Sequence, residues 1–569
     1  MKKLTKLASV LSVVALSVAG LTSCGSSDNA SKAGTPADTL VVGTLDKVMT
    51  IDPAGSYDHG SKDIQDEIFL KLYDYAYNST VAEPSLATSG DFSADGKLFV
   101  VKIRKGIKFA NGNDLTSSDV KYTFDRILNI KDPNGPDSML EGIDSIATPD
   151  DETVEFTLKN PNDVTIKQVL AANAGPIVDE DVFPFDRSLT DDEVVASKGY
   201  FGQYNIVSYT KNESAVLEAN PDYQGLLPAP AMKKVNLKYY TTDSNLKIDL
   251  TSGKIDAAFN GLGATDVADL ESNDNVTVTQ AEGGRYDFIA FNFHTQPYGL
   301  SQPDADPQLA LAVRTAVANL IDRKAIAKDV FKDTYEPAYS IVGGGLEGKV
   351  DTFKSLSEAD PAIDPSNNLG DGKGGPSLEK AKAVLETFEI PTPVALNIQY
   401  NPDHYTAAST EEYNAIKSQL EESGLFKVTL GTTEWTTYQK DRVNTESGDG
   451  KYPVYQLGWF NDFPDADNFL TPFFGGSEFI HGGYGEAGTH VGMDTGWQEL
   501  LASEPGITDD AKRLEVIKKI QVLITPDVPI IPIVQGKIIA FTAKGVTGVE
   551  QVVNAAQSYR FGALSKAAL

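Results

Sequence analysis

The stretch DGKLFVVKIRKGIKFANGNDLTSSDVKYTFDRI, at residues 95–127, decides much of the fold. Its first part, Leu98 to Ile103, is a run rich in apolar and β-branched residues. Asp95-Gly96 and Lys105-Gly106 flank this run with turn-forming pairs. Such a run between two turns predicts a short strand that is at least half buried.

The second part of the same stretch has the pattern of a helix. Thr116 stands three residues before Asp119, which is the spacing of a capped helix N-terminus. The apolar residues that follow at helical spacing, and therefore share one face, are Val120, Phe124 and Ile127. The quoted residues thus predict a strand followed by an amphipathic helix.

Outward from this stretch, strand and helix patterns alternate along the chain. Further helices are predicted to begin at Asp306-Pro307, to span Leu378 to Phe388, and to run from a cap at Thr508 to Pro526. Strands are predicted at Val235 to Tyr240, Phe288 to Phe293, Val394 to Tyr400 and Val454 to Gly458. The alternation indicates an α/β protein, and a chain of 569 residues is long enough for two or three domains.

The charge of the chain restricts its partners. The sequence has 80 Asp and Glu against 49 Lys and Arg, a formal net charge of −31. A surface this acidic repels nucleic acid and anionic lipid headgroups. It favours a cationic ligand over an anionic one, within the roughly 10 Å that salt leaves unscreened.

The single cysteine, Cys24, stands at the end of an export pattern. Lysines near the start precede an apolar and small-residue run from Leu7 to Gly20, which indicates a signal peptide over residues 1–23. Leu21 to Cys24 resembles a lipobox, in which the cysteine becomes the lipid-modified N-terminus. A chance cysteine behind an ordinary cleavage site is the alternative. Residues 24–39 then predict a lipidated cysteine followed by a flexible tether.

The sequence contains no convincing catalytic constellation. It has neither a Gly-x-Ser-x-Gly elbow nor a phosphate loop ending in Gly-Lys-Ser or Gly-Lys-Thr, and its five histidines lack the zinc-protease spacing. Asp462, Asp465 and Asp467 could coordinate calcium, but the Gly and the distant Glu of an EF-hand loop are missing. The sequence therefore predicts a protein that is not an enzyme and that needs no metal or cofactor.

Motifs spaced along the whole chain accompany the 95–127 stretch. They are Ile51-Asp52-Pro53, Glu83-Pro84-Ser85-Leu86-Ala87, Asn220-Pro221, Gly253-Lys254-Ile255-Asp256, Val313-Arg314-Thr315-Ala316, Ile321-Asp322-Arg323, Gly458-Trp459 with Asp462, and Pro529-Ile530-Ile531-Pro532. Together they resemble family 5 of the extracytoplasmic solute-binding proteins, whose members include the peptide binders of ABC importers. The resemblance extends from Leu40 to Phe561. One departure is Gly202-Gln203-Tyr204, where the family usually has Gly-Pro-Tyr.

The resemblance implies a two-lobed, periplasmic-binding-protein-like α/β fold of type II, cluster C, with an extra domain beside the first lobe. In this family the lobes close on the ligand about a hinge. Carried over to this chain, the first lobe comprises residues 40–82, 206–293 and 536–569. The extra domain comprises residues 83–205, and the second lobe residues 294–535.

The resemblance also implies a ligand site. In peptide-binding members, the Asp that follows the Gly-Trp pair binds the α-ammonium of the peptide, and here that residue is Asp462. A desolvated ammonium needs such a carboxylate. The strand before it is expected to pair with the peptide backbone as an added strand. The other predicted ligand-binding residues are Gly458, Trp459, Phe460, Trp435, Tyr57, Asp58 and His59.

Two of these residues have simpler interpretations. Asp462 could cap the turn that follows it, and Trp435 could belong to the core. The resemblance, with the lipobox at Cys24, predicts a monomeric, lipid-anchored protein on the outer face of the cell membrane. Asp462 would be its ligand for the peptide ammonium. The protein would capture peptides and deliver them to the permease subunits of an ABC importer. The alternatives are the same fold binding an oligosaccharide or a nickel chelate, and, in a different class, a cell-envelope enzyme.

The lipid anchor gives the first testable prediction. Changing Cys24 to Ser removes the thiol that would carry the lipid, so the variant should appear in the medium or remain unprocessed. The measurement is fractionation of cells expressing wild type or Cys24→Ser, with immunoblotting of membranes and medium. A cleaved Cys24→Ser protein that still fractionates with membranes as the wild type does would contradict lipidation at this residue.

Overall fold

Three sheets of four or more strands organise the part of the chain that the computed structural model describes. That part is residues 38–259, 261–406, 408–443, 448–475, 482–486 and 496–566. The predicted signal peptide, Cys24 and the tether up to residue 37 lie outside the described residues. None of the helices in these ranges is long and apolar enough to cross a membrane.

The first sheet has seven strands in the order β12-β19-β11-β1-β10-β9-β8. Their bounds are β1 Thr39–Thr44, β8 Tyr204–Thr210, β9 Ser214–Ala219, β10 Lys234–Tyr239, β11 Ala257–Phe259, β12 Val276–Ala281 and β19 Ile538–Ala543. Helices α5 (Asp243–Thr251) and α6 (Ala264–Glu271) bury Leu246 and Leu270 against Phe541 of β19 on one face. Helix α1 (His59–Ile68) packs Ile64 and Ile68 against the opposite face.

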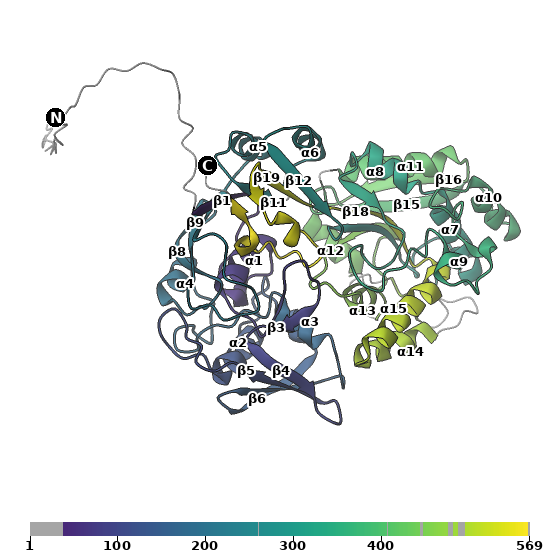
Figure 1. Cartoon of the computed structure of the whole chain (residues 1–569). Coiled ribbons are helices and arrows are strands. Elements are labelled where there is room, and N and C mark those ends of the chain that lie inside the picture. The colour runs from purple at the N-terminus through teal and green to yellow at the C-terminus, as the bar shows by residue number, and fades with distance from the viewer. Residues whose placement is uncertain are drawn as a thin grey trace, which may run out of the picture. The chain divides into compact units, whose positions relative to one another are not determined.

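The second sheet has six strands in the order β14-β18-β13-β17-β15-β16. Their bounds are β13 Tyr286–Phe291, β14 Tyr335–Pro337, β15 Val394–Tyr400, β16 Phe426–Thr432, β17 Val454–Trp459 and β18 Ile530–Gly536. Around it lie α7 Pro307–Leu320, α8 Arg323–Asp329, α9 Leu356–Ala359, α10 Leu378–Thr387, α11 Ser409–Glu422, α12 Trp435–Val443, α13 Asp467–Phe474, α14 Gly496–Ser503 and α15 Asp510–Ile524. One continuous apolar core joins this sheet to α7, α11 and α15. These helices lie beside the sheet in Figure 1.

The quoted stretch forms the third sheet and its helix. The sheet has the order β4-β5-β7-β6, with bounds β4 Ala87–Phe92, β5 Leu98–Ile103, β6 Ile143–Asp150 and β7 Thr153–Leu158. Helix α2 (Ser117–Ile130) begins with a complete capping box, in which the N–H of Thr116 donates to Asp119 at 2.8 Å. The predicted strand and helix are thus confirmed. Also in this part of the chain are β2 Tyr73–Tyr75, β3 Ala82–Pro84, α3 Ile166–Ala171 and α4 Asp191–Ser197.

A buried ion pair ties this third sheet and α2 to the chain that follows β1. Arg126 of α2 donates to both carboxylate oxygens of Asp52, at 2.9 and 2.6 Å. The two side chains are 1% and 0% exposed. Asp52 also accepts from the N–H of Leu189 at 2.7 Å. Asp52 belongs to the Ile-Asp-Pro motif, so this motif residue has a structural role.

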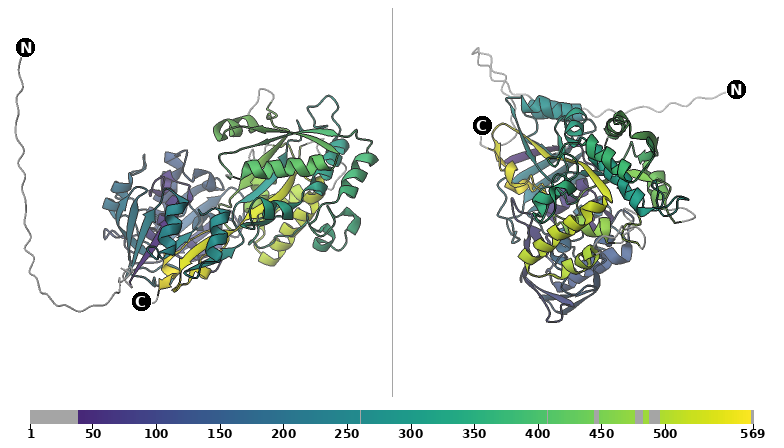
Figure 2. Two further views of the ribbon diagram at one scale, coloured as in Figure 1. Left: turned by 90° about the horizontal axis from the view of Figure 1, so that it is seen from above. Right: turned by 90° about the vertical axis from the view of Figure 1, so that its right-hand side faces the viewer.

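The chain passes between the first two sheets through two neighbouring segments. One connects β12 to β13 and the other connects β18 to β19, and β13 pairs antiparallel with β18. The N–H of Gly536 donates to the carbonyl of Arg285 at 2.7 Å where the segments meet. The yellow C-terminal strands can be followed from one sheet to the other in Figure 2.

These pairings bear on the predicted boundaries. The division into two lobes and an extra domain stays a prediction, but β13 pairs within the six-stranded sheet, although the predicted first lobe extended to residue 293. The passage between the sheets therefore precedes Tyr286. Two local predictions also shift: β13 begins two residues before Phe288, and Asp509 rather than Thr508 caps α15, because its carboxylate accepts from the N–H of Lys512.

The buried Asp52–Arg126 pair gives the second prediction. Changing Arg126 to Met leaves the Asp52 carboxylate buried without its cation, which typically costs about 3–5 kcal/mol in the free energy of unfolding. Urea unfolding of the two proteins measures this cost. The double variant Asp52→Asn/Arg126→Met should lose less than Arg126→Met alone, because no unpaired charge remains.

The control is an exposed pair in the same sheet region. Lys105 and Glu152 lie 2.6 Å apart with side chains 74% and 41% exposed, so Lys105→Met should leave the unfolding midpoint unchanged. Equal losses in the free energy of unfolding for Arg126→Met and Lys105→Met would show that the buried pair contributes no more to stability than the exposed pair.

Candidate ligand-binding site

Asp462 lies just beyond the end of β17, in the loop that leads to α13. The first turn of α13 holds it in place. Its N–H donates to Oδ1 of Asn468 at 2.7 Å, and Nδ2 of Asn468 donates back to Oδ2 of Asp462 at 3.0 Å. This reciprocal pair fixes the carboxylate and leaves its other oxygen, Oδ1, directed elsewhere. Asp462 therefore does help to order the turn that follows it.

The second oxygen of Asp462 meets the first part of the chain. The hydroxyl of Tyr57, 405 residues earlier in the sequence, donates to Oδ1 of Asp462. Close by, the ring of His59 meets the ring of Phe460 edge to face, with centroids 5.3 Å apart. The structure thus brings together four of the predicted site residues, from the segment before and at the start of α1 and from the end of β17.

The surroundings of this contact are poor in positive charge. Burial raises the pKa of the Asp462 carboxyl, against the lowering effect of hydrogen bonds from Asn468 and Tyr57. Burial and then the Asp462 carboxylate raise the pKa of Tyr57, although 38% of that side chain is exposed. Burial and nearby Lys62 lower the pKa of His59 to about 4, so His59 is neutral at pH 7. A carboxylate in such surroundings is a good partner for a cation from outside.

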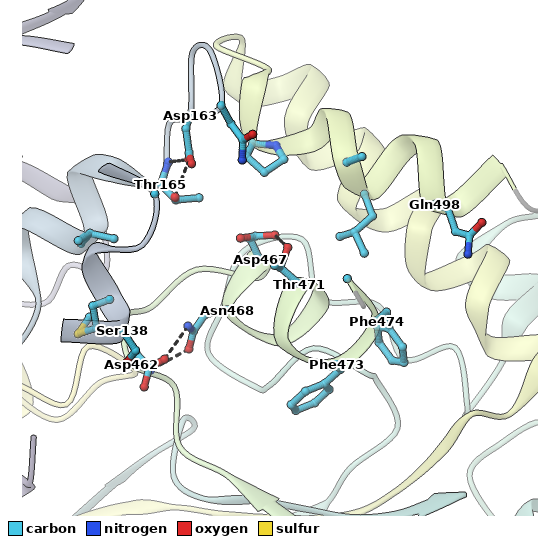
Figure 3. A pocket seen from close by; sticks show the side chains of 18 of the residues that line it. Ser138, Asp163, Thr165, Asp462, Asp467, Asn468, Thr471, Phe473, Phe474 and Gln498 are labelled. Atoms are coloured by element: carbon cyan, nitrogen blue, oxygen red, sulfur yellow. Dashed lines mark hydrogen bonds between the residues drawn. The ribbon is translucent and has the colours of Figure 1, made fainter. Parts of the chain in front are cut away.

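Asp462 lines a cavity of about 950 Å³ (Figure 3). One wall comes from residues between Ser138 and Val169, around the third sheet, and the other from residues between Asp462 and Pro505. The N–H of Val164 donates to the carbonyl of Pro505 at 2.8 Å and joins the two walls. The cavity is large enough for a small peptide or another ligand of drug size.

A second cavity, of about 250 Å³, lies beside the passage between the sheets. His59, Phe460, Arg285, Tyr335, Lys537 and Tyr559 are among its lining residues. Because Phe460 lines this cavity and Asp462 lines the larger one, the short segment from Phe460 to Asp462 separates the two spaces. This segment therefore borders both candidate ligand spaces.

The remaining residues of the predicted strand are packed into the sheet. Gly458 opposes Asp287 of β13, and a Cβ atom at Gly458 would come within 2.7 Å of the Tyr405 ring. Trp459 is half buried and meets Phe473 edge to face at 5.7 Å. These contacts of Gly458 and Trp459 hold β17 in the sheet. Their contact with a ligand stays a prediction.

Two other predicted residues have clear local roles. Asp58 caps α1, and its carboxylate accepts from the N–H and the hydroxyl of Ser61 at 2.8 and 2.7 Å. Trp435 is half buried and stacks on His404, with centroids 3.6 Å apart and planes 7° apart. Among the described lining residues of the two cavities, neither Asp58 nor Trp435 is present. A ligand role for these two residues likewise stays a prediction.

Sequence reasoning missed two residues at the larger cavity. Asn468, which holds Asp462, lies one helical turn into α13, a relation that the position of Asp462 alone does not reveal. Asp163 reaches the cavity from the segment between β7 and α3, about 300 residues earlier in the sequence. Only the packing of distant segments brings it there. Within the described ranges, no group of His, Cys, Asp and Glu is arranged to hold a metal ion.

A buried acidic cluster stands behind the cavity wall. Arg513 donates to both oxygens of Asp465, each at 2.8 Å, and its Nε lies 2.5 Å from Oε1 of Glu504. The Glu504 side chain is fully buried. Burial, followed by the nearby Asp467 carboxylate, raises the pKa of Glu504. Burial also raises the pKa of Asp467. One guanidinium therefore serves three carboxyl groups.

Comparison with known structures identifies the fold. HbpA2 from Haemophilus parasuis superposes with a TM-score of 0.75 at 21% identity, covering 93% of this chain and 100% of that one. DppA from Helicobacter pylori, solved with the peptide STSA, gives a TM-score of 0.65 at 20% identity, with coverages of 93% and 98%. The chain has the periplasmic-binding-protein fold of type II, which confirms the predicted fold class.

The sequence identifies the family. Residues 81–480 match the model of the bacterial extracellular solute-binding proteins, family 5. The oligopeptide-binding protein OppA of Bacillus subtilis is 24% identical over 476 residues, which is 79% of each chain. This chain belongs to the family 5 extracellular solute-binding proteins, as its motifs indicated. The relatives named here are binding proteins rather than enzymes.

The buried cluster gives the third prediction. The folded pKa of Glu504 lies above its ordinary value of 4.5. Above pH 4.5 the unfolded chain therefore releases a proton that the folded chain retains, and the free energy of unfolding falls as pH rises. In Glu504→Gln, the glutamine resembles the protonated glutamate and does not ionise, so the free energy of unfolding of this variant lacks this fall with pH. The melting temperature of Glu504→Gln minus that of wild type should increase from pH 5 to pH 8.

Calorimetry at several pH values measures this difference. Glu499→Gln is the matched control, because Glu499 is exposed on the neighbouring helix α14. Its difference from wild type should stay flat over the same range. A flat difference for Glu504→Gln would mean that Glu504 ionises normally in the folded protein.

Proposed function

We propose that this protein is a lipid-anchored extracellular binding protein that captures peptides and delivers them to the permease subunits of an ABC importer. The observation that carries the proposal is the position of Asp462. It is a half-buried carboxylate on the wall of a cavity of about 950 Å³, held by Asn468 and contacted by Tyr57 from a distant part of the chain.

The chemistry of this position suits the α-ammonium of a peptide. An ammonium group enters an apolar site only with an anionic partner, and charge-assisted hydrogen bonds are roughly twice as strong as neutral ones. Among the described residues, Asp462 makes no ion pair of its own. A ligand ammonium would meet the Asp462 carboxylate beside the Tyr57 hydroxyl, with the Phe460 and His59 rings next to it.

The printed descriptions of two relatives support a peptide as the solute. OppA of Bacillus subtilis is named as an oligopeptide-binding protein, and DppA of Helicobacter pylori was solved with a peptide. The anchor at Cys24, the monomeric state and the closure of two lobes on the ligand are parts of the same proposal. They follow from the sequence motifs and the family resemblance, and no enzymatic step is proposed.

The contact between Asp462 and the ammonium gives the fourth prediction. Asp462→Ala leaves the ammonium unpaired, which typically costs about 2–5 kcal/mol, roughly 30-fold to several thousand-fold in affinity. N-acetylation of the peptide should cost wild type a similar amount, because it removes the same charge from the ligand. The two losses should not add, since both delete one interaction.

Isothermal titration calorimetry on the four combinations tests this cycle, with a peptide that binds wild type. Asp274→Ala is the control, because Asp274 is exposed in the turn before β12. It should leave both affinities unchanged. Wild-type binding that is indifferent to acetylation would remove Asp462 from this role and favour the oligosaccharide or nickel-chelate alternative.

A further inference from the structure

The charged side chains that line the larger cavity are all acidic within the part of the chain that the structure describes. They are Asp163, Asp462, Asp467 and Glu486, and no Lys, Arg or His stands among the described lining residues. A cleft lined by one sign of charge concentrates the opposite sign. The α-ammonium of a peptide would neutralise only one of these four carboxylates.

Two of the acids face the space from opposite sides (Figure 3). Asp163 comes from the segment between β7 and α3, and its carboxylate accepts from the N–H and the hydroxyl of Thr165 at 3.0 and 2.6 Å. Asp467 comes from the start of α13 and accepts from the hydroxyl of Thr471 at 2.5 Å. Neither is within ion-pair distance of another described residue, and these hydrogen bonds orient both carboxylates.

The nearby basic side chains are already engaged. Arg513, the guanidinium next to Asp467, forms its two-pronged contact with Asp465 and also approaches Glu504. His294 lies 3.0 Å from Glu486. Burial raises the pKa of both Asp163 and Asp467, and the Asp465 carboxylate adds to both rises, against the lowering effect of Arg513 and of the threonine hydrogen bonds. Because Arg513 also serves Asp465 and Glu504, it offsets the charge of this pair only in part.

The rest of the wall suits the stem of a long basic side chain. Met139, Ile166, Val169 and Phe463 line the same cavity and provide apolar surface. Lys and Arg bury their methylene groups along such surfaces while the charged head reaches polar partners. Because Asp462 also lines this cavity, a peptide that binds there through its ammonium has its first side chains within the same space.

We propose that this cavity selects peptides with a Lys or Arg among their first two residues, whose charged head lies between Asp163 and Asp467. The inference rests on the proposed function, since it assumes that Asp462 binds the peptide ammonium. It adds a substrate class to that function: short peptides with a basic N-terminal part. The selected side chain would bridge the third-sheet region and α13.

A peptide series tests the selection. The probes are Lys-Ala-Ala, Ala-Lys-Ala, norleucine-Ala-Ala, Ala-Ala-Ala and Glu-Ala-Ala, titrated calorimetrically into the wild-type protein. At least one lysine peptide should bind about 10-fold or more tightly than norleucine-Ala-Ala, which matches the stem and lacks the charge. Glu-Ala-Ala should bind most weakly, and the preference for lysine should shrink as salt is added.

Variants of the cavity assign the selection to its residues. Asp163→Asn, which keeps the size of the side chain, should reduce the preference for lysine over norleucine to about 3-fold or less. Asp467→Asn should act in the same direction. Asp163→Lys should reverse the preference in favour of Glu-Ala-Ala. Asp144→Asn is the matched control. Asp144 is exposed on β6, so this substitution removes the same charge outside the cavity.

The outcomes separate this inference from the proposed function. If Ala-Ala-Ala binds and the lysine peptides bind no more tightly than norleucine-Ala-Ala, the selection is overturned and peptide binding stands. If the preference survives in Asp163→Asn and in Asp467→Asn alike, the assignment to this cavity is overturned. If no peptide of the series binds wild type, peptide binding and the selection fall together.

Discussion

The pairing of β13 with β18 at the passage between the two large sheets is the constraint on which the rest of the structure depends. Since β17 lies beside β13, the end of β17 and Asp462 come to the same boundary. Side chains then link this boundary to the end of the chain: Nε2 of Gln557 donates to the carbonyl of Gly283 at 2.9 Å and to Oδ1 of Asn461 at 3.0 Å. The residue next to Asp462 is therefore fixed relative to the passage itself.

The other side of the site depends on the buried pair of Asp52 and Arg126. This pair joins the segment after β1 to α2, and Tyr57 follows Asp52 by only five residues. The same pair holds α2 and the third sheet, from which Asp163 reaches the larger cavity. Two motif residues that look unrelated in the sequence thus position both the hydroxyl that contacts Asp462 and one wall of the cavity. Their role is mechanical and they touch no ligand space.

The sequence predicted well where the controlling interaction is local. The capping box at Thr116 and Asp119 predicted the start of α2, and β15 has the predicted bounds, because caps and strand patterns act within a few residues. It predicted less where several segments meet. Thr508 and Asp509 both suit a cap, and only the backbone geometry chooses Asp509. The role of Asp163 depends on packing against residues about 300 positions away, which no local pattern reports.

The acidic cavity also connects binding to stability. Burial raises the pKa of Asp462, Asp467 and Glu504, so the folded chain holds several carboxyl groups where ionisation is unfavourable. Selection for stability alone would favour apolar or neutral side chains at these positions, because buried charges without partners destabilise a fold. Arg513 compensates only in part, since it is bound to Asp465. Under the proposed selection, a cation bound in the cavity would supply the missing charge, and its binding would stabilise the folded chain. The unfavourable ionisation of these carboxyl groups and the proposed affinity for a basic ligand would therefore have the same physical origin.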